Sequence, residues 1–277
     1  MNADSDLNPT RVLVCGDWHG NLAHMKAAVR AAEVHGCQVL VQVGDLGILW
    51  PGEHPKSFDL PLVEEVEKRG IVFVFVDGNH DNHAALREFD PEPDGFVEVL
   101  RGVFWAPRGH RWTWSGVSFA ALGGAFSVDW QWRTEGESVW WGLETPKQEE
   151  ADRLGSEPVD VLLTHDVPTG VPVASQFQVD PVTEREAGVT RHLLKDVVDR
   201  LHPKLVFSGH WHQRVSHVLS KKPPVRAEVL HMDGNPFNAV ILELASLEVT
   251  ELATLEPDWH LWTRRREKNH RSANVDD

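Results

Sequence analysis

The stretch from Arg11 to Asp45 reads RVLVCGDWHGNLAHMKAAVRAAEVHGCQVLVQVGD. Its two apolar runs, residues 11–16 and 39–43, are short and rich in β-branched side chains, which is typical of strands buried on both faces. Between them, Asn21 is a good helix N-cap, and Gly36 is a typical residue for ending a helix. The stretch therefore predicts a strand, a helix and a second strand parallel to the first.

The same alternation continues along the chain. A helical segment at residues 59–69 precedes an apolar run at 71–76, so the first part of the sequence predicts a βαβαβ unit with right-handed crossovers. Two later apolar runs, residues 159–163 and 204–207, are also strand-like. Eight shorter candidates resemble antiparallel strands joined by turns, and they predict a second sheet stacked on the first. These candidates are residues 97–100, 103–105, 111–114, 117–122, 215–219, 225–231, 238–244 and 247–253.

The composition indicates a globular α/β protein with an acidic surface. The formal net charge is -15, from 42 acidic and 27 basic residues, which disfavours binding to long duplex nucleic acid or to an anionic membrane. A ligand that carries phosphate would need local positive charge at its site, and bound cations are the obvious source. The sequence does not predict an oligomeric state.

The ends of the chain and its cysteines suggest a cytoplasmic protein. The polar start MNADSDLNPT does not resemble a secretory signal, and no apolar run approaches the ~20 residues that a membrane span needs. We expect a disordered N-terminus at residues 1–10, one domain at 11–262 and a disordered basic tail at 263–277. Buried, unpaired thiols are the favoured interpretation of Cys15 and Cys37.

Polar residues that metals favour follow five of the apolar runs. Because ligands gather at the carboxyl ends of parallel strands, we expect these residues to meet at one edge. They supply oxygen and imidazole ligands without a thiolate, as suits two divalent cations, and they predict a dinuclear hydrolase site. The five segments are Asp17-Trp18-His19, Gly44-Asp45, Gly78-Asn79-His80-Asp81, Thr164-His165-Asp166 and Gly209-His210-Trp211-His212.

The residue types suggest separate roles within this set. Asp45 follows a glycine that lets its carboxylate approach a cation, so it is the best candidate to bridge two metals. Asn79 could ligate through its amide oxygen, whereas His80 could act on the substrate, with Asp81 orienting its imidazole. His210 and His212 are two residues apart and could face one metal each. The two tryptophans inside these motifs, at positions 18 and 211, are expected to pack against the sheet rather than to wall the site.

Taken in order, these motifs resemble those of the calcineurin-like metallophosphoesterase superfamily, whose blocks are Asp-x-His, Gly-Asp, Gly-Asn-His-Asp/Glu, His and Gly-His-x-His. The resemblance runs from residue 11 to about 213 and implies a four-layer α/β/β/α sandwich with two stacked mixed sheets. It departs from the family at one place, because many members carry a second Asp shortly after the bridging one. By this likeness one cation would be held by Asp17, His19, Asp45 and His212, and the other by Asp45, Asn79, His165 and His210.

The resemblance implies a metal-dependent hydrolase of phosphate monoesters or diesters. In the expected reaction, a hydroxide between the two metals attacks phosphorus directly and His80 acts as the general acid. Manganese is the favoured metal, with iron, zinc, magnesium, nickel and cobalt as alternatives, since mixed oxygen and nitrogen sites accept several. Nucleotides, nucleic-acid ends, phosphoproteins and phospholipids all stay open as substrates. The alternative is a catalytically idle metal-binding scaffold of the same fold.

The segment at residues 123–144, GGAFSVDWQWRTEGESVWWGLE, holds four tryptophans, at positions 130, 132, 140 and 141. As a rim beside the metals, these rings could stack on a base while Arg133 pairs with a phosphate. Asn79, Arg133, Trp140 and Trp141 are therefore our candidate substrate contacts, with a nucleotide-like ester as one possible substrate. A structural subdomain or an interface is an equally favoured interpretation of the segment.

Overall fold

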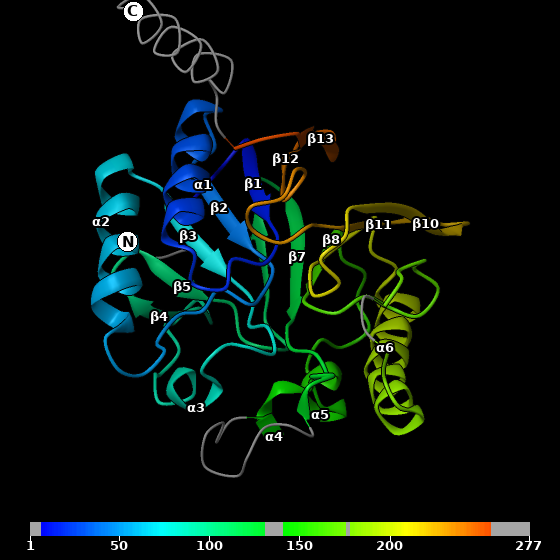
Figure 1. Cartoon of the computed structure of the whole chain (residues 1–277). Coiled ribbons are helices and arrows are strands. Elements are labelled where there is room, and N and C mark those ends of the chain that lie inside the picture. The colour runs from blue at the N-terminus through cyan, green and yellow to red at the C-terminus, as the bar shows by residue number, and fades with distance from the viewer. Residues whose placement is uncertain (1–6, 131–140, 176–177, 256–277) are drawn as a thin grey trace, which may run out of the picture.

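Two β-sheets lie face to face, with helices on their outer sides (Figure 1). The structure is a computed structural model, and it describes residues 7–130, 141–175 and 178–255. Within these residues one sheet has seven strands, in the order β13-β12-β1-β2-β3-β5-β4, and the other has six, in the order β10-β11-β9-β8-β7-β6. The bounds of the first sheet's strands are β1 (Arg11–Cys15), β2 (Val39–Gln42), β3 (Val72–Phe75), β4 (Val97–Leu100), β5 (Val103–Trp105), β12 (Ala239–Glu243) and β13 (Glu248–Leu252). Those of the second are β6 (Arg111–Trp114), β7 (Val117–Leu122), β8 (Val161–Thr164), β9 (Leu205–Ser208), β10 (Val215–Lys221) and β11 (Pro224–Val229).

Three apolar layers hold the sandwich together. The first lies between the two sheets, the second between the seven-stranded sheet and α1 and α2, and the third between the six-stranded sheet and α6. The predicted α/β fold, with two stacked mixed sheets flanked by helices, is therefore confirmed. The helical segments are α1 (Leu22–Val34), the single turn η1 (Pro55–Asp59), α2 (Leu60–Arg69), α3 (His83–Leu86), α4 (Trp141–Glu144), α5 (Gln148–Asp152) and α6 (Pro181–Leu201).

The short predicted strands divide between the two sheets instead of forming one of their own. β4 and β5 extend the first sheet, as do β12 and β13, whereas β6 and β7 belong to the second. The hairpin partners are antiparallel, as expected, but β5 also pairs in parallel with β3, and β7 with β8. Both sheets are mixed because each of these hairpins joins a parallel core at its edge.

Helix α6 was not among the predicted elements, although its start carries a recognisable signal. Asp180 caps it by accepting the backbone N–H groups of Val182 and Thr183, and Pro181 fills the first helical position. The half of the helix nearest its carboxyl end buries Leu194, Val197, Val198 and Leu201 against the second sheet. The other half is largely exposed and lies beside the site described below.

Both cysteines are buried and free, as predicted, and burial raises the pKa of each thiol. Across the described residues, none of the helices is long and apolar enough to cross a membrane. The two segments expected to be disordered, residues 1–10 and 263–277, lie mostly or wholly outside the described ranges. Their bounds, and that of the domain at 11–262, stay predictions.

Candidate metal centre

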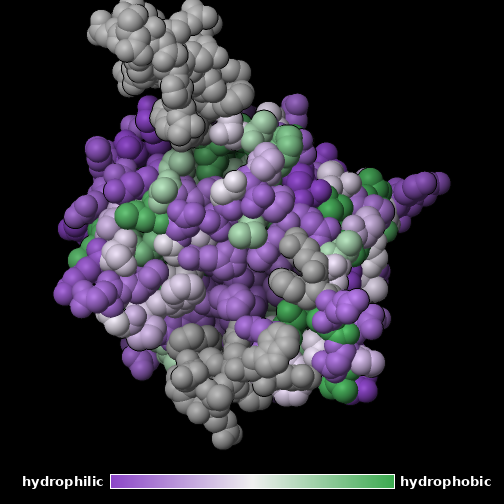
Figure 2. Space-filling view, viewed as in Figure 1, coloured by the Kyte–Doolittle hydropathy of each residue, from purple (hydrophilic) through white to green (hydrophobic). Residues whose placement is uncertain are grey.

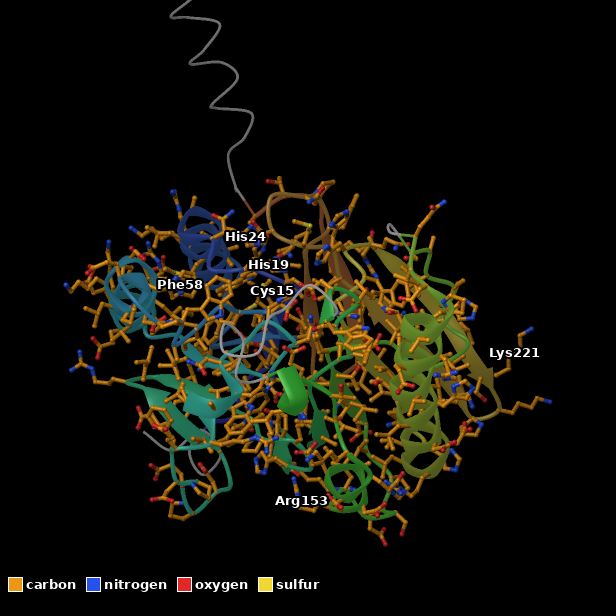
Figure 3. The ribbon with its side chains drawn as sticks, turned by 60° about the horizontal axis from the view of Figure 1, so that its bottom comes forward. Cys15, His19, His24, Phe58, Arg153 and Lys221 are labelled. Carbon is orange, nitrogen blue, oxygen red and sulfur yellow. The ribbon has the colours of Figure 1, made fainter. Side chains whose placement is uncertain are left out.

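The loops at the carboxyl ends of five strands, three from one sheet and two from the other, meet at one place. Three of them follow β1, β2 and β3 in the first sheet, and two follow β8 and β9 in the second. In Figure 3, His19 lies near the middle of the molecule, between the helices of the two outer layers. Six of the seven predicted ligands fall into two groups, within each of which the ligand atoms lie within 4.8 Å of one another. These groups are Asp17, His19 and His212, and Asp45, His165 and His210.

The first group is built around the fully buried carboxylate of Asp17. Its Oδ2 lies 3.1 Å from His212 Nε2, and both of its oxygens accept the backbone N–H of His210. The rings of His19 and His212 meet edge to face, with their centroids 5.1 Å apart. Two imidazoles and a carboxylate therefore face one point from loops nearly two hundred residues apart in sequence.

The second group is deeper and surrounds His165, which is fully buried. Its Nε2 lies 3.3 Å from Asp45 Oδ1 and 3.0 Å from the amide oxygen of Asn79. Its other ring nitrogen, Nδ1, lies 2.7 Å from the carbonyl oxygen of Val43, which fixes the ring so that Nε2 points into the site. Asn79, the seventh predicted ligand, thus reaches the second group.

Asp45 connects the two groups. Its Oδ1 faces His165, whereas its Oδ2 lies 3.5 Å from His19 Nε2 in the first group. The side chain is buried, and its Oδ1 also accepts the backbone N–H of His80. A carboxylate placed in this way can give one oxygen to each of two cations.

Four of the seven predicted ligands have a backbone conformation that residues other than glycine rarely adopt. The φ angles are 47° for His19, 56° for Asp45, 64° for His210 and 50° for His212, all in the left-handed region. Each such residue costs about 1–3 kcal/mol, and such strain gathers at functional sites. The backbone of these loops is therefore strained, and this conformation turns the four side chains toward one another.

Two glycines are required by the same close packing. A Cβ atom at Gly78 would lie 2.1 Å from the backbone nitrogen of Asp45, and one at Gly209 would lie 2.0 Å from Asp17 Oδ1. Neither distance is compatible with a side chain. The glycines of the Gly-Asn-His-Asp and Gly-His-x-His motifs thus make room for the two buried carboxylates.

The donor set and its charges fit two divalent cations. Burial by itself would lower the pKa of the His165 and His19 imidazoles, but the nearby Asp45 and Asp17 carboxylates raise these pKa values to about 10 and about 9. Burial would raise the pKa of Asp45, yet the imidazoles of His165 and His80 hold it well below its usual range. The protons on His19 and His165 offset the buried carboxylates, which is what metal ions would do in their place.

Asp81 supports the loops of this centre. Its carboxylate accepts the backbone N–H groups of Gly78 at 2.7 Å, Gly47 at 2.9 Å and Asp45 at 3.1 Å. Burial and the charge of Asp45 raise the pKa of Asp81 to about 6. These hydrogen bonds tie the loop after β2 to the loop after β3, and the role expected for Asp81 in orienting the imidazole of His80 stays a prediction.

Asp233 is a component of the site that the sequence analysis missed. Its Oδ1 lies 3.3 Å from His19 Nδ1, its Oδ2 accepts the Asn21 side chain at 2.6 Å, and its backbone N–H donates to the Asp17 carbonyl oxygen at 2.7 Å. A carboxylate on the far nitrogen of a metal-binding imidazole fixes the ring and its tautomer. His231, two residues earlier, accepts the Met232 N–H with its own Nδ1.

A chain of polar groups anchors both ends of the tryptophan-rich segment beside Asn79. The Asn79 amide donates to Ser127 Oγ at 2.9 Å, and Ser127 in turn donates to the Glu144 carboxylate. The backbone carbonyl of Glu144 accepts from Arg108, whose guanidinium also lies 2.6 Å from the fully buried Asp77. Ser127 and Glu144 therefore fix the segment against a predicted metal ligand.

Residues 131–140 of that segment lie outside the described residues. Arg133 and Trp140, two of the predicted substrate contacts, are not among the described residues, and Trp141 is described only as the first residue of α4. Trp130 is described, and its indole N–H donates to Thr183 on α6 at 3.0 Å. Of the two tryptophans within the motifs, Trp18 is buried and packs against Phe73, as expected, and Trp211 is half-buried and packs against the apolar layer between the second sheet and α6.

Comparisons with known proteins agree with the architecture. The family model for the calcineurin-like phosphoesterase matches residues 10–214. No curated protein matches the sequence. A solved structure from Thermus thermophilus shares 15% identity, covers 90% of this chain and 100% of its own, and superimposes with a TM-score of 0.56. A dimetal phosphatase from Danio rerio shares 13% identity, covers 86% of this chain and 93% of its own, and gives a TM-score of 0.51.

Proposed function

Since the chain belongs to the calcineurin-like phosphoesterase family, we propose that it is a dinuclear metal-dependent hydrolase of phosphate monoesters or diesters. The observation that carries this proposal is the position of Asp45, whose two oxygens face two separate groups of metal-binding side chains. One cation would be held by Asp17, His19, Asp45 and His212, and the other by Asp45, Asn79, His165 and His210.

When bound, the two cations would lower the pKa of a water ligand and offset the charge on the phosphoryl oxygens. The protein's own groups hold this arrangement in place. Asp17 is fixed by the His210 N–H, and His165 by the Val43 carbonyl, so the ligands need little reorganisation to bind. A preorganised site of this kind stabilises developing charge better than mobile groups in water.

His80 is the proposed general acid. Its backbone N–H is held by Asp45 Oδ1 at 2.8 Å, and its ring centroid lies 6.2 Å from that of His19. The imidazole therefore lies at the edge of the first ligand group without belonging to either group. From this position it would give a proton to the leaving oxygen of the ester, which contributes about 10²–10⁴-fold in rate for a well-placed group.

The test is a panel of phosphate esters assayed with the manganese-loaded protein. We expect turnover of at least one ester and its loss in Asp45→Asn, which weakens both ligand groups at once. His217→Ala on β10, well outside the ligand groups, is the matched control and should retain activity. Hydrolysis of only bis-ester probes would select a diesterase, whereas full metal loading without turnover of any ester would contradict the proposal and favour a scaffold.

A further inference from the structure

A cavity of about 430 Å³ opens beside the candidate metal centre. His210 and His212, one predicted ligand of each cation, form part of its wall, so the cavity is continuous with the proposed site of reaction. The opposite wall is the exposed half of α6, with Ala187, Gly188 and Arg191. Cavities that hold small ligands commonly measure about 300–1,000 Å³, so this one can hold an organic group.

The walls of this cavity are mostly apolar. Val128, Val173, Val179 and Ala187 contribute side chains that cannot hydrogen-bond. In Figure 2, hydrophilic side chains fill the centre of the visible face, and apolar ones lie among hydrophilic ones on the side toward α6. An apolar cavity next to a polar centre favours a ligand with one charged end and one apolar end.

A rigid pair of flat groups also lines the cavity. The indole N–H of Trp211 donates to the buried carboxylate of Asp166 at 2.8 Å, and the guanidinium of Arg191 lies 5.0 Å from the centre of the Trp211 ring. Arg191 also donates to the carbonyl oxygens of Val167 and Val171, at 3.4 and 3.1 Å. Both planes are thus fixed before a ligand arrives, and flat groups of this kind stack well on planar rings.

We infer that this cavity binds the organic part of the phosphate ester, and that this part carries a planar ring, as in an aryl or nucleoside ester. The inference rests on the proposed function, because the phosphoryl group would sit at the metal centre while the ring enters the cavity. A short alkyl group would leave most of the apolar wall in contact with water. The ring would bury that wall, and the gain in affinity scales with the apolar area removed from water.

Gly188 offers a way to fill the cavity without disturbing the fold. A Cβ atom at this position would meet no other atom within 4 Å, and a leucine favours the helix more than glycine does. Val189, the next residue of α6, is 59% exposed and does not line the cavity, so Val189→Leu is the matched control. Both variants carry a leucine on the same helix, and only Gly188→Leu directs it into the cavity.

The test compares two ligands that cannot be hydrolysed, phenylphosphonate and methylphosphonate, by calorimetric titration of the manganese-loaded protein. We expect the wild type and Val189→Leu to bind phenylphosphonate at least tenfold more tightly than methylphosphonate. Gly188→Leu should lose this preference while its affinity for methylphosphonate changes less than twofold. Circular dichroism and metal content should match among the three proteins.

Two outcomes would overturn the inference: equal affinity of the wild type for both phosphonates, or an unchanged preference in Gly188→Leu. Neither depends on turnover, so each is distinct from a failure of the proposed function. If the protein binds phenylphosphonate as expected but hydrolyses no ester, the ring-binding cavity stands and only the proposed hydrolase function is wrong. If the protein hydrolyses ring-bearing and alkyl esters without preference, only the proposed role of the cavity is wrong.

Discussion

Replacing Gly209 with alanine should disable one cation site and spare the fold. The Cβ atom of an alanine at this position would lie 2.0 Å from Asp17 Oδ1, and its next contact, with Asp17 Cγ, is at 3.2 Å. The φ angle of Gly209 is not in the left-handed region, so the backbone itself tolerates alanine. The whole perturbation therefore falls on the carboxylate of Asp17.

The size of the effect follows from the distances. Ordinary contact with a Cβ atom begins near 3.4 Å, so the Asp17 oxygen must move by about 1.4 Å. Ligand distances in metal sites vary by only about 0.2 Å, and the loss of a mere supporting group already costs 10–100-fold in affinity. We expect the cation of the first group to bind at least 100-fold more weakly, equivalent to about 2.7 kcal/mol. The His210 N–H also loses its acceptor, which should destabilise the metal-free protein by about 1–3 kcal/mol.

The assay is a manganese titration against a competing chelator, together with urea unfolding of the metal-free protein. Wild type should bind two ions, and Gly209→Ala should bind one ion with near-normal affinity and a second only weakly. Gly188→Ala is the control, since its added methyl group meets no atom within 4 Å, and it should bind both ions normally. Two ions bound by Gly209→Ala with wild-type affinity would refute the assignment of Asp17 as a ligand.

Three further predictions concern single residues. His80→Ala should keep both metals but lower kcat at least 100-fold, and normal turnover of an aryl phosphate or a phosphodiester would remove His80 as the acid. Asp233→Ala should lower the affinity for the cation of the first group by about 10–100-fold in a chelator competition. Asp233→Asn should recover part of this affinity, because its amide oxygen still accepts from His19 Nδ1. Unchanged affinity in Asp233→Ala would show that Asp233 does not position His19. Burial lowers the pKa of His110 to about 4, so the unfolded chain takes up the proton first and stability is lost as pH falls from about 6.5 toward 4. His110→Phe keeps the ring contacts with Phe96 and Trp112. Between pH 7 and pH 5, its free energy of unfolding in urea should therefore fall by about 2 kcal/mol less than that of the wild type. An equal fall in both proteins would contradict the lowered pKa of His110 as the cause.

The parallel core of the fold could be predicted because its signals are local. The runs that became β1, β2 and β3 are short, apolar and β-branched, and Asn21 caps α1 as expected. The sheet to which each hairpin belongs could not be predicted in the same way. β4–β5 and β6–β7 have similar alternating patterns, and only tertiary packing decides that one joins β3 and the other β8. Local pattern gives the strand, whereas its neighbour depends on distant residues.

The same difference between local patterns and distant contacts applies to the residues of the candidate site. Its motifs were visible because each interrupts an apolar run, and that pattern needs no knowledge of distant contacts. Asp233 gave no such signal, since it lies in an irregular stretch after β11 and owes its role to His19, over two hundred residues earlier. The Ser127 and Glu144 contacts that anchor the segment near Asn79 are equally non-local. Supporting groups are harder to find than ligands because their identity follows from geometry alone.

The charge of the chain and the charge of the site together limit how a phosphate ester can bind. The whole protein has a net charge of -15, and three carboxylates, Asp17, Asp45 and Asp81, lie buried around the centre. Without cations, the protons on His19 and His165 are already paired with Asp45, so they offset the buried carboxylates rather than attract a phosphate. Two divalent cations would reverse the local sign, because they add four positive charges and displace at most these two protons. Substrate affinity, and not only the rate of reaction, should therefore depend on metal loading, whereas the apolar cavity beside α6 would discriminate among esters once the metals are bound.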